Sequence, residues 1–152
     1  MLTPHAVRAQ GDSVGVYCPM DFNATYTTRY LSSQLRSAIA DGTTLHGVDM
    51  GEPVQRTLYG EGFYGDEIEA VEEVAKAQGY RQVLLLTFAG GQARFVCVDM
   101  DAPEQSQELI AELPEDITDA EFADLFQQVV AAFLPDYARS RKDSLPLGTF
   151  SL

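Results

Sequence analysis

Two apolar runs joined by a pair of glycines constrain the fold of this chain more than any other feature. The runs cover 83–88 and 93–98, and residues 89–92 (Ala-Gly-Gly-Gln) lie between them. Strand-forming runs on either side of Gly-Gly predict a β-hairpin, because tight hairpin turns need residues that accept a positive φ. The first run is apolar almost throughout. We therefore expect a strand that is buried on both faces at the centre of a sheet.

Apolar spacing before and after the hairpin predicts the remaining elements. The other expected strands are 13–18, 44–50 and 54–59. The expected helices are about 24–40, 66–78, 103–113 and 118–134. Two hairpin-type strand pairs favour an antiparallel or mixed sheet. The predicted fold is therefore α+β, a central sheet of about five strands with three to four helices packed on it.

Local signals predict where three of these helices begin or end. Asp66 is expected to cap the second helix, which Gly79 ends. Asp101 is expected to open the third helix before a proline. Thr118 and Glu121 match the S/T-x-x-E pattern of a capping box. The inward face of the second helix is predicted to carry Ile68, Val71, Val74 and Ala75.

The composition predicts a single globular domain over 1–152. A chain of 152 residues with 45% hydrophobic content is large enough to bury a core without disulfides or metals. Cys18 and Cys97 lie within apolar strand patterns and are expected to be buried, and the sequence leaves their pairing open. No signal-peptide pattern and no apolar run near the ~20 residues of a membrane span is present, which predicts a cytoplasmic protein.

The excess negative charge lies in one stretch of the chain. Residues 61–124 hold 16 acidic and three basic residues, which accounts for the whole net charge of −13. Such a surface repels nucleic acid and anionic membranes and attracts basic protein surfaces. The predicted partner-binding acids are Glu104, Glu108, Glu112, Glu115 and Asp116. A solvated helix face has the same pattern, so charge alone leaves simple solubility open as well.

A glycine-aromatic segment precedes the second predicted helix. Residues 60–65 (Gly-Glu-Gly-Phe-Tyr-Gly) match the G-x-G-x-x-G pattern of dinucleotide-binding loops. Glu61 and Asp66 would repel a pyrophosphate, and no acid ends the next strand to hold a ribose. We therefore expect no nucleotide and no cofactor here. Phe63 and Tyr64 instead suit protein recognition and join the predicted partner-binding set.

Candidate metal and catalytic residues are sparse. Asp99 and Asp101 are weak candidates for Mg²⁺ or Ca²⁺ ligands, because both metals prefer oxygen, but these acids also suit the end of a strand and a helix cap. Cys18 and Cys97 lack the sequence surroundings of a Cys nucleophile, which needs a nearby base. We expect a protein that is not an enzyme.

Three functions fit these observations, and the charge distribution favours the first. The first is a non-enzymatic acidic protein that docks on a basic surface of a protein partner, as an inhibitor, immunity, anti-defence or chaperone protein. The second is an assembly subunit, in a phage particle or a homo-oligomer, which uses an apolar C-terminal tail at about 143–152. The third is a small-molecule-binding protein or small enzyme built on the 60–65 loop.

Overall fold

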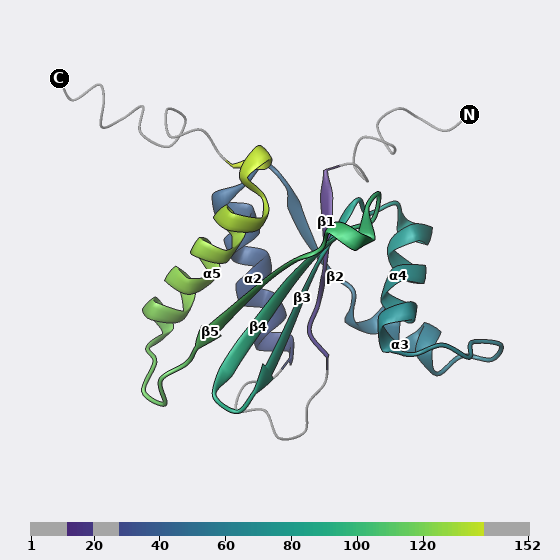
Figure 1. Ribbon diagram of the computed structural model, residues 1–152, viewed down its shortest axis with the longest axis horizontal. Helices are drawn as coiled ribbons and strands as arrows, with labels where there is room; N and C mark the ends of the chain where they lie inside the picture. Colours follow the sequence, from purple (N-terminus) through teal and green to yellow (C-terminus); the bar gives the residue numbers. More distant parts are fainter. Residues whose placement is uncertain (1–11, 20–27, 139–152) are drawn as a thin grey trace.

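The computed structural model describes residues 12–19 and 28–138, which form a mixed five-stranded sheet with helices on both faces (Figure 1). The strands are β1 (Ser13–Tyr17), β2 (His46–Asp49), β3 (Gln82–Ala89), β4 (Gln92–Asp99) and β5 (Gln107–Glu112). The α-helices are α2 (Thr28–Gly42), α3 (Gly51–Leu58), α4 (Glu67–Gln78) and α5 (Asp119–Phe133). Two short 3₁₀ helices are η1 (Pro103–Gln105) and η2 (Pro135–Tyr137). The predicted α+β class is confirmed. The predicted tail at 143–152 lies outside the described residues.

The strand order is β2-β1-β3-β4-β5, and the pairing changes from parallel to antiparallel across the sheet. β1 runs parallel to both β2 and β3, whereas β3–β4 and β4–β5 are antiparallel. The predicted hairpin is confirmed, with Gly90 at φ 58° and Gly91 at φ 77° in its turn. β3 is the central strand, as its apolar sequence predicts.

The two faces of the sheet carry separate hydrophobic clusters. α2 and α5 cover one face, where Leu84 and Leu86 of β3 are buried. α3 and α4 pack on the other face over β1 and β3, where Val83 and Leu85 are buried. Successive β3 residues point to opposite faces, so the strand is buried from both sides.

α5 is held on its face of the sheet by aromatic contacts. The ring of Phe126 lies edge-on to Phe95 of β4 at 5.6 Å and to Phe122 at 4.9 Å between centroids. Edge-to-face packing is a favourable geometry for aromatic pairs. The predicted capping box is confirmed, since Thr118 accepts from the Glu121 N–H and Glu121 accepts from the Thr118 N–H. Asp66 and Gly79 begin and end α4 as predicted.

Two predicted elements are wrong. Residues 51–58 form helix α3 rather than a strand at 54–59, and only Val54 of this short helix is fully buried. Residues 103–113 are not a helix but η1 followed by strand β5, and Ala102 instead of Asp101 occupies the cap position of η1. Ile68 was also predicted to face inward, yet it is 48% exposed at the start of α4.

Among the described residues, no helix is long and apolar enough to cross a bilayer.

Candidate functional site

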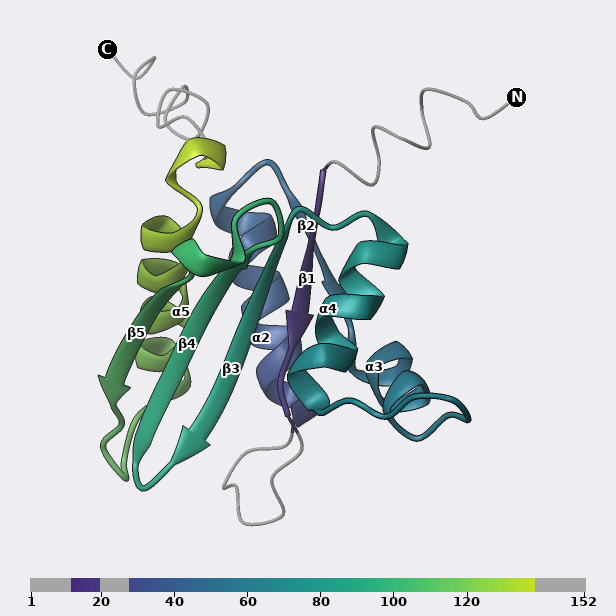
Figure 2. The ribbon, with the colours of Figure 1, turned by 45° about the vertical axis from the view of Figure 1, so that its right-hand side comes forward.

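One face of the sheet is left uncovered at β4 and β5 (Figure 2). The β4–β5 register places Val96 opposite Glu108, Arg94 opposite Ile110, and Gln92 opposite Glu112. Directly opposite residues share a face, and Val96 packs against the α3/α4 cluster. This row therefore lies on the α3/α4 side; Val96 borders the α3/α4 cluster, and the rest of the row extends away from the two helices (Figure 2). We call it the open sheet face; it consists of Gln92, Arg94, Val96, Glu108, Ile110 and Glu112.

The open sheet face combines acids with an exposed apolar side chain. Arg94 forms an ion pair with Glu108, and the Gln92 amide donates to Glu112 Oε1 at 2.7 Å. Ile110 lies between the two acids along β5 and is 56% exposed. The Arg94–Glu108 pair is itself largely exposed, so it contributes at most ~1 kcal/mol to stability.

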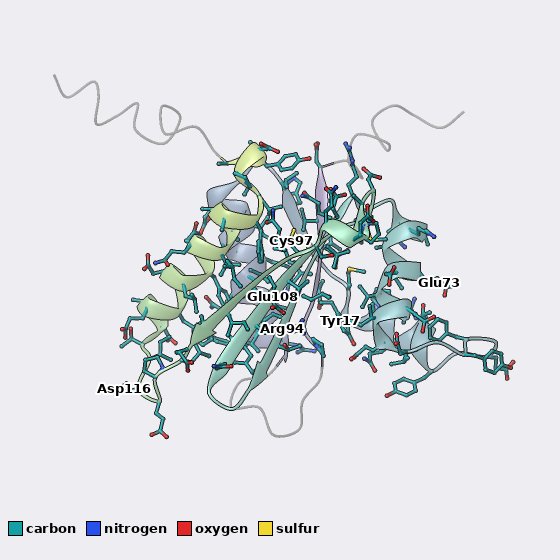
Figure 3. The ribbon with its side chains drawn as sticks, viewed as in Figure 1. Tyr17, Glu73, Arg94, Cys97, Glu108 and Asp116 are labelled. Carbon is teal, nitrogen blue, oxygen red and sulfur yellow. The ribbon has the colours of Figure 1, made fainter. Side chains whose placement is uncertain are left out.

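The five predicted acids lie along the β5 edge of the sheet. Glu104 is on η1 before the strand, Glu108 and Glu112 are on β5, and Glu115 and Asp116 follow it (Figure 3). All five side chains are exposed. A strand of this length spans about 20 Å, so the acids are spread along an edge rather than gathered on one helical face. The sequence alone did not indicate Arg94 or Ile110, because their proximity depends on the strand pairing.

The predicted aromatic residues lie elsewhere. The loop between α3 and α4 extends away from the sheet on the side opposite β5 (Figure 1). Tyr64 and Tyr59 are 96% and 80% exposed. Phe63 is half-buried against the α3/α4 cluster and lines an open hollow of about 330 Å³ with three glutamates and Lys76 of α4. The aromatic residues and the β5 acids therefore do not form one surface.

The dinucleotide pattern lacks its structural context. Residues 60–65 follow helix α3, whereas the binding motif needs a strand before the loop. Gly62 has a positive φ of 84°, which explains the glycine at that position by backbone geometry.

A polar cavity of about 280 Å³ opens at the carboxyl ends of β1 and β2. Its lining residues are Tyr17, Cys18, Arg29, Ser32, Asp49, Gly51, Glu52 and Gln55. The Tyr17 hydroxyl donates to Glu67 Oε2 at 2.5 Å and accepts from Gln55 Nε2 at 2.8 Å. Burial, reinforced by Glu67, raises the pKa of Tyr17. Burial also raises the pKa of the Cys18 thiol to about 12, with the Asp49 carboxylate adding to the effect. Both groups stay protonated at neutral pH.

A second, apolar cavity of about 190 Å³ lies between α4 and the sheet. It is lined by Ile68, Val71, Glu72, Val83, Leu85, Val98, Met100, Pro103 and Ser106. Exposed Ile68 borders this cavity, which gives that side chain apolar neighbours despite its contact with solvent.

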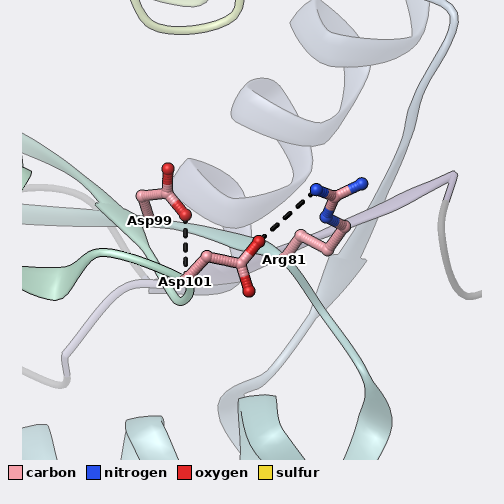
Figure 4. A network of polar contacts seen from close by, with 3 residues as sticks. All are labelled: Arg81, Asp99 and Asp101. Carbon is pink, nitrogen blue, oxygen red and sulfur yellow. Dashed lines mark hydrogen bonds and ion pairs between the residues drawn. The ribbon is translucent and has the colours of Figure 1, made fainter.

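The weak metal candidates are engaged in a turn after β4 (Figure 4). Asp99 Oδ1 accepts from the Asp101 N–H at 2.9 Å, and Asp101 Oδ2 lies 3.4 Å from the Arg81 guanidinium. A guanidinium at that position competes with a metal cation for the carboxylate. Within residues 12–19 and 28–138, no three His, Cys, Asp or Glu side chains gather in a way that could hold a metal ion. Cys18 and Cys97 are both buried and unpaired.

Comparison with known proteins gives a similarity in fold alone. The chain matches no protein-family model and no curated protein. Among solved structures, a PelC dodecamer from Paraburkholderia phytofirmans is similar, with a TM-score of 0.52 and 16% sequence identity. The match covers 86% of this chain and 91% of that one.

Proposed function

We propose that this chain is a non-enzymatic acidic binding protein that docks on a basic surface of a protein partner. The observation that carries the proposal is the β5 edge, where five exposed acids accompany an exposed isoleucine. The partner would be the target of an inhibitor, immunity, anti-defence or chaperone protein. Two unpaired buried cysteines are consistent with action in the cytoplasm, where thiols stay reduced.

The two kinds of side chain at this edge have different roles in the proposed docking. The acids steer a basic partner toward the surface and make association fast and sensitive to salt. Ile110 provides apolar contact that is desolvated once the partner is in place. The loop between α3 and α4, which carries Phe63 and Tyr64, lies on the side opposite β5 (Figure 1), and these two residues would serve as a second, separate contact.

Capture of the partner, followed by measured kinetics, tests this proposal. The full chain is immobilised at low salt with a host lysate, and proteins released by increasing salt are identified by mass spectrometry. The purified partner is then measured against the double variant Glu108→Lys/Glu112→Lys. We expect an association rate at least tenfold slower, with a much smaller change for the matched variant Asp41→Lys/Asp124→Lys, whose exposed acids lie on α2 and α5. Equal association rates for the two variants would show that the β5 edge does not contribute to docking.

A second candidate is a homo-oligomeric assembly subunit. The observation that favours it is the similarity in fold to PelC, whose structure is a dodecamer. Native mass spectrometry of the full chain and of a chain ending at residue 138 tests it. A defined oligomer that is lost on truncation would support both self-assembly and the role of the 143–152 tail. Monomers from both chains would exclude this candidate.

A further inference from the structure

β5 is an unpaired edge of the sheet. The strand order ends at β5, and no other described strand lies beyond it. The Leu113 N–H donates to Gly91 O at 2.8 Å. In an antiparallel pair every second residue bonds to the neighbouring strand, so the β5 side bonds to β4 through Gln107, Leu109, Ala111 and Leu113. The alternate residues Glu108, Ile110 and Glu112 consequently direct their N–H and C=O groups away from β4. These groups are the template that an added strand needs.

β5 is a regular edge strand, and its charged side chains are the feature that would oppose pairing with strands of other chains. β5 keeps six consecutive register pairs with β4, and it contains no proline and no lysine. Proline, lysine and bulges are common ways to block an exposed strand. Here the blocking groups are Glu108 and Glu112, whose side chains lie on the open sheet face beside Ile110.

The charge pattern of β5 determines which kind of strand can pair with it. Suppose that a second copy paired its β5 antiparallel to this one, with the two Ile110 residues opposite each other. Glu108 of each copy would then lie opposite Glu112 of the other. Acids directly opposite each other destabilise a strand pair. A strand with a cation opposite each acid and an apolar residue opposite Ile110 would instead gain two favourable pairs and an apolar contact. No helix covers this side of β5, so its side chains would have room (Figure 2).

We infer that β5 binds an extended basic segment of a protein partner by antiparallel strand addition. The segment carries cationic side chains four residues apart with an apolar residue midway between them. This inference rests on the proposed binding function and specifies the part of the partner that is recognised. Main-chain hydrogen bonds to Glu108, Ile110 and Glu112 would provide affinity, and the alternate side chains would provide specificity.

A short peptide tests the inference. The probe is the capped heptapeptide Thr-Lys-Thr-Val-Thr-Lys-Thr, added to the full chain at low salt while amide hydrogen exchange is followed by NMR. We expect slower exchange at the amides of Glu108, Ile110 and Glu112, since the peptide would pair with them. An N-methyl group on the peptide valine, which faces β5 in this register, should abolish binding. The same group on the neighbouring threonine, which faces away, should leave binding intact.

Protein variants provide the matching controls. Glu108→Lys/Glu112→Lys should weaken binding of the lysine peptide at least tenfold, whereas Asp41→Lys/Asp124→Lys, at exposed acids of α2 and α5, should have a much smaller effect. Binding that depends on charge but tolerates both N-methyl groups would overturn strand addition and leave the proposed acidic docking intact. No binding of the peptide would also overturn the inference, while partner capture would still test the function. A further outcome is that the amides of Glu108, Ile110 and Glu112 are already protected in the protein alone, and more strongly at higher protein concentration. A second copy would then occupy the edge, and the inference would be wrong.

Discussion

Phe126 packs α5 against the sheet. It is fully buried and contacts the rings of Phe95 and Phe122 edge-on. We expect Phe126→Ala to lower the free energy of unfolding by ~3–5 kcal/mol, because the truncation leaves a cavity and removes both ring contacts. Urea denaturation followed by circular dichroism measures the change. The control Leu125→Ala, at a half-buried neighbour, should cost clearly less. Equal losses would mean that the helix face is not packed as described.

The two buried thiols make the stability depend on alkaline pH. Burial raises the pKa of Cys97 to about 11, with Asp99 adding to it, and that of Cys18 to about 12. Both folded values exceed that of an unfolded thiol, so the protonated form stabilises the fold. This stabilisation is complete below pH ~8.5 and is lost as the pH rises toward the folded values. We expect the free energy of unfolding to fall between about pH 8.5 and about pH 11, and less steeply in Cys97→Ala.

Alkylation provides an independent check on the same residues. Iodoacetamide at about pH 8 should modify neither cysteine in the native protein, because both thiols are buried and protonated. Both should react once the chain is unfolded in urea. Rapid modification of the native protein, detected by mass spectrometry, would contradict the burial of these side chains.

Helices α4 and α5 are stabilised by capping interactions at their N-termini, and the capping box of α5 is the clearest example. Thr118 accepts a hydrogen bond from the Glu121 N–H at 3.1 Å. We expect Thr118→Ala to cost ~1 kcal/mol of stability, whereas Thr118→Ser keeps the acceptor and should cost less. The Thr118 backbone N–H and, to a smaller extent, the Thr118 hydroxyl lower the pKa of Glu121. Alanine keeps the backbone donor and loses only the hydroxyl, so the pKa of this carboxylate should rise only part of the way toward its ordinary value in the alanine variant. NMR titration of the Glu121 side chain measures that shift, and a pKa that returned fully to the ordinary value would contradict the backbone hydrogen bond of the capping box.

The wrong prediction of a helix at 103–113 has a clear physical cause. Glu104, Glu108 and Glu112 at a spacing of four fit one helical face, but an even spacing also places Glu108 and Glu112 on one face of a strand. Glutamate, glutamine, leucine and alanine favour helix locally, and pairing with β4 overrides that preference in β5. The hairpin, the Thr118–Glu121 capping box and the Asp66 cap were predictable, because their signals are local. The open sheet face was not, because Arg94 and Ile110 meet only through strand register.

At the scale of the whole molecule, negative charge opposes compactness. The net charge is −13, and the three ion pairs among the described residues, Arg56–Glu52, Arg81–Asp101 and Arg94–Glu108, are all exposed. Exposed pairs stabilise little, whereas self-repulsion acts over the whole surface. We therefore expect the melting temperature at neutral pH to rise by several degrees when NaCl is raised from about 20 mM to about 200 mM, since salt screens the repulsion. Differential scanning calorimetry measures it.

The sign of this salt effect separates the two contributions. If the exposed ion pairs outweighed the repulsion, added salt would lower the melting temperature instead, because screening weakens attraction as well. Repeating the measurement near pH 4.5 is the control, since many carboxylates are then protonated and the repulsion is smaller. The salt effect should shrink there. A persistent rise at that pH would point to salting-out of apolar surface rather than to relief of charge repulsion. The variant Glu72→Gln/Glu73→Gln, which removes two charges from α4, should raise the melting temperature at low salt and reduce its response to NaCl.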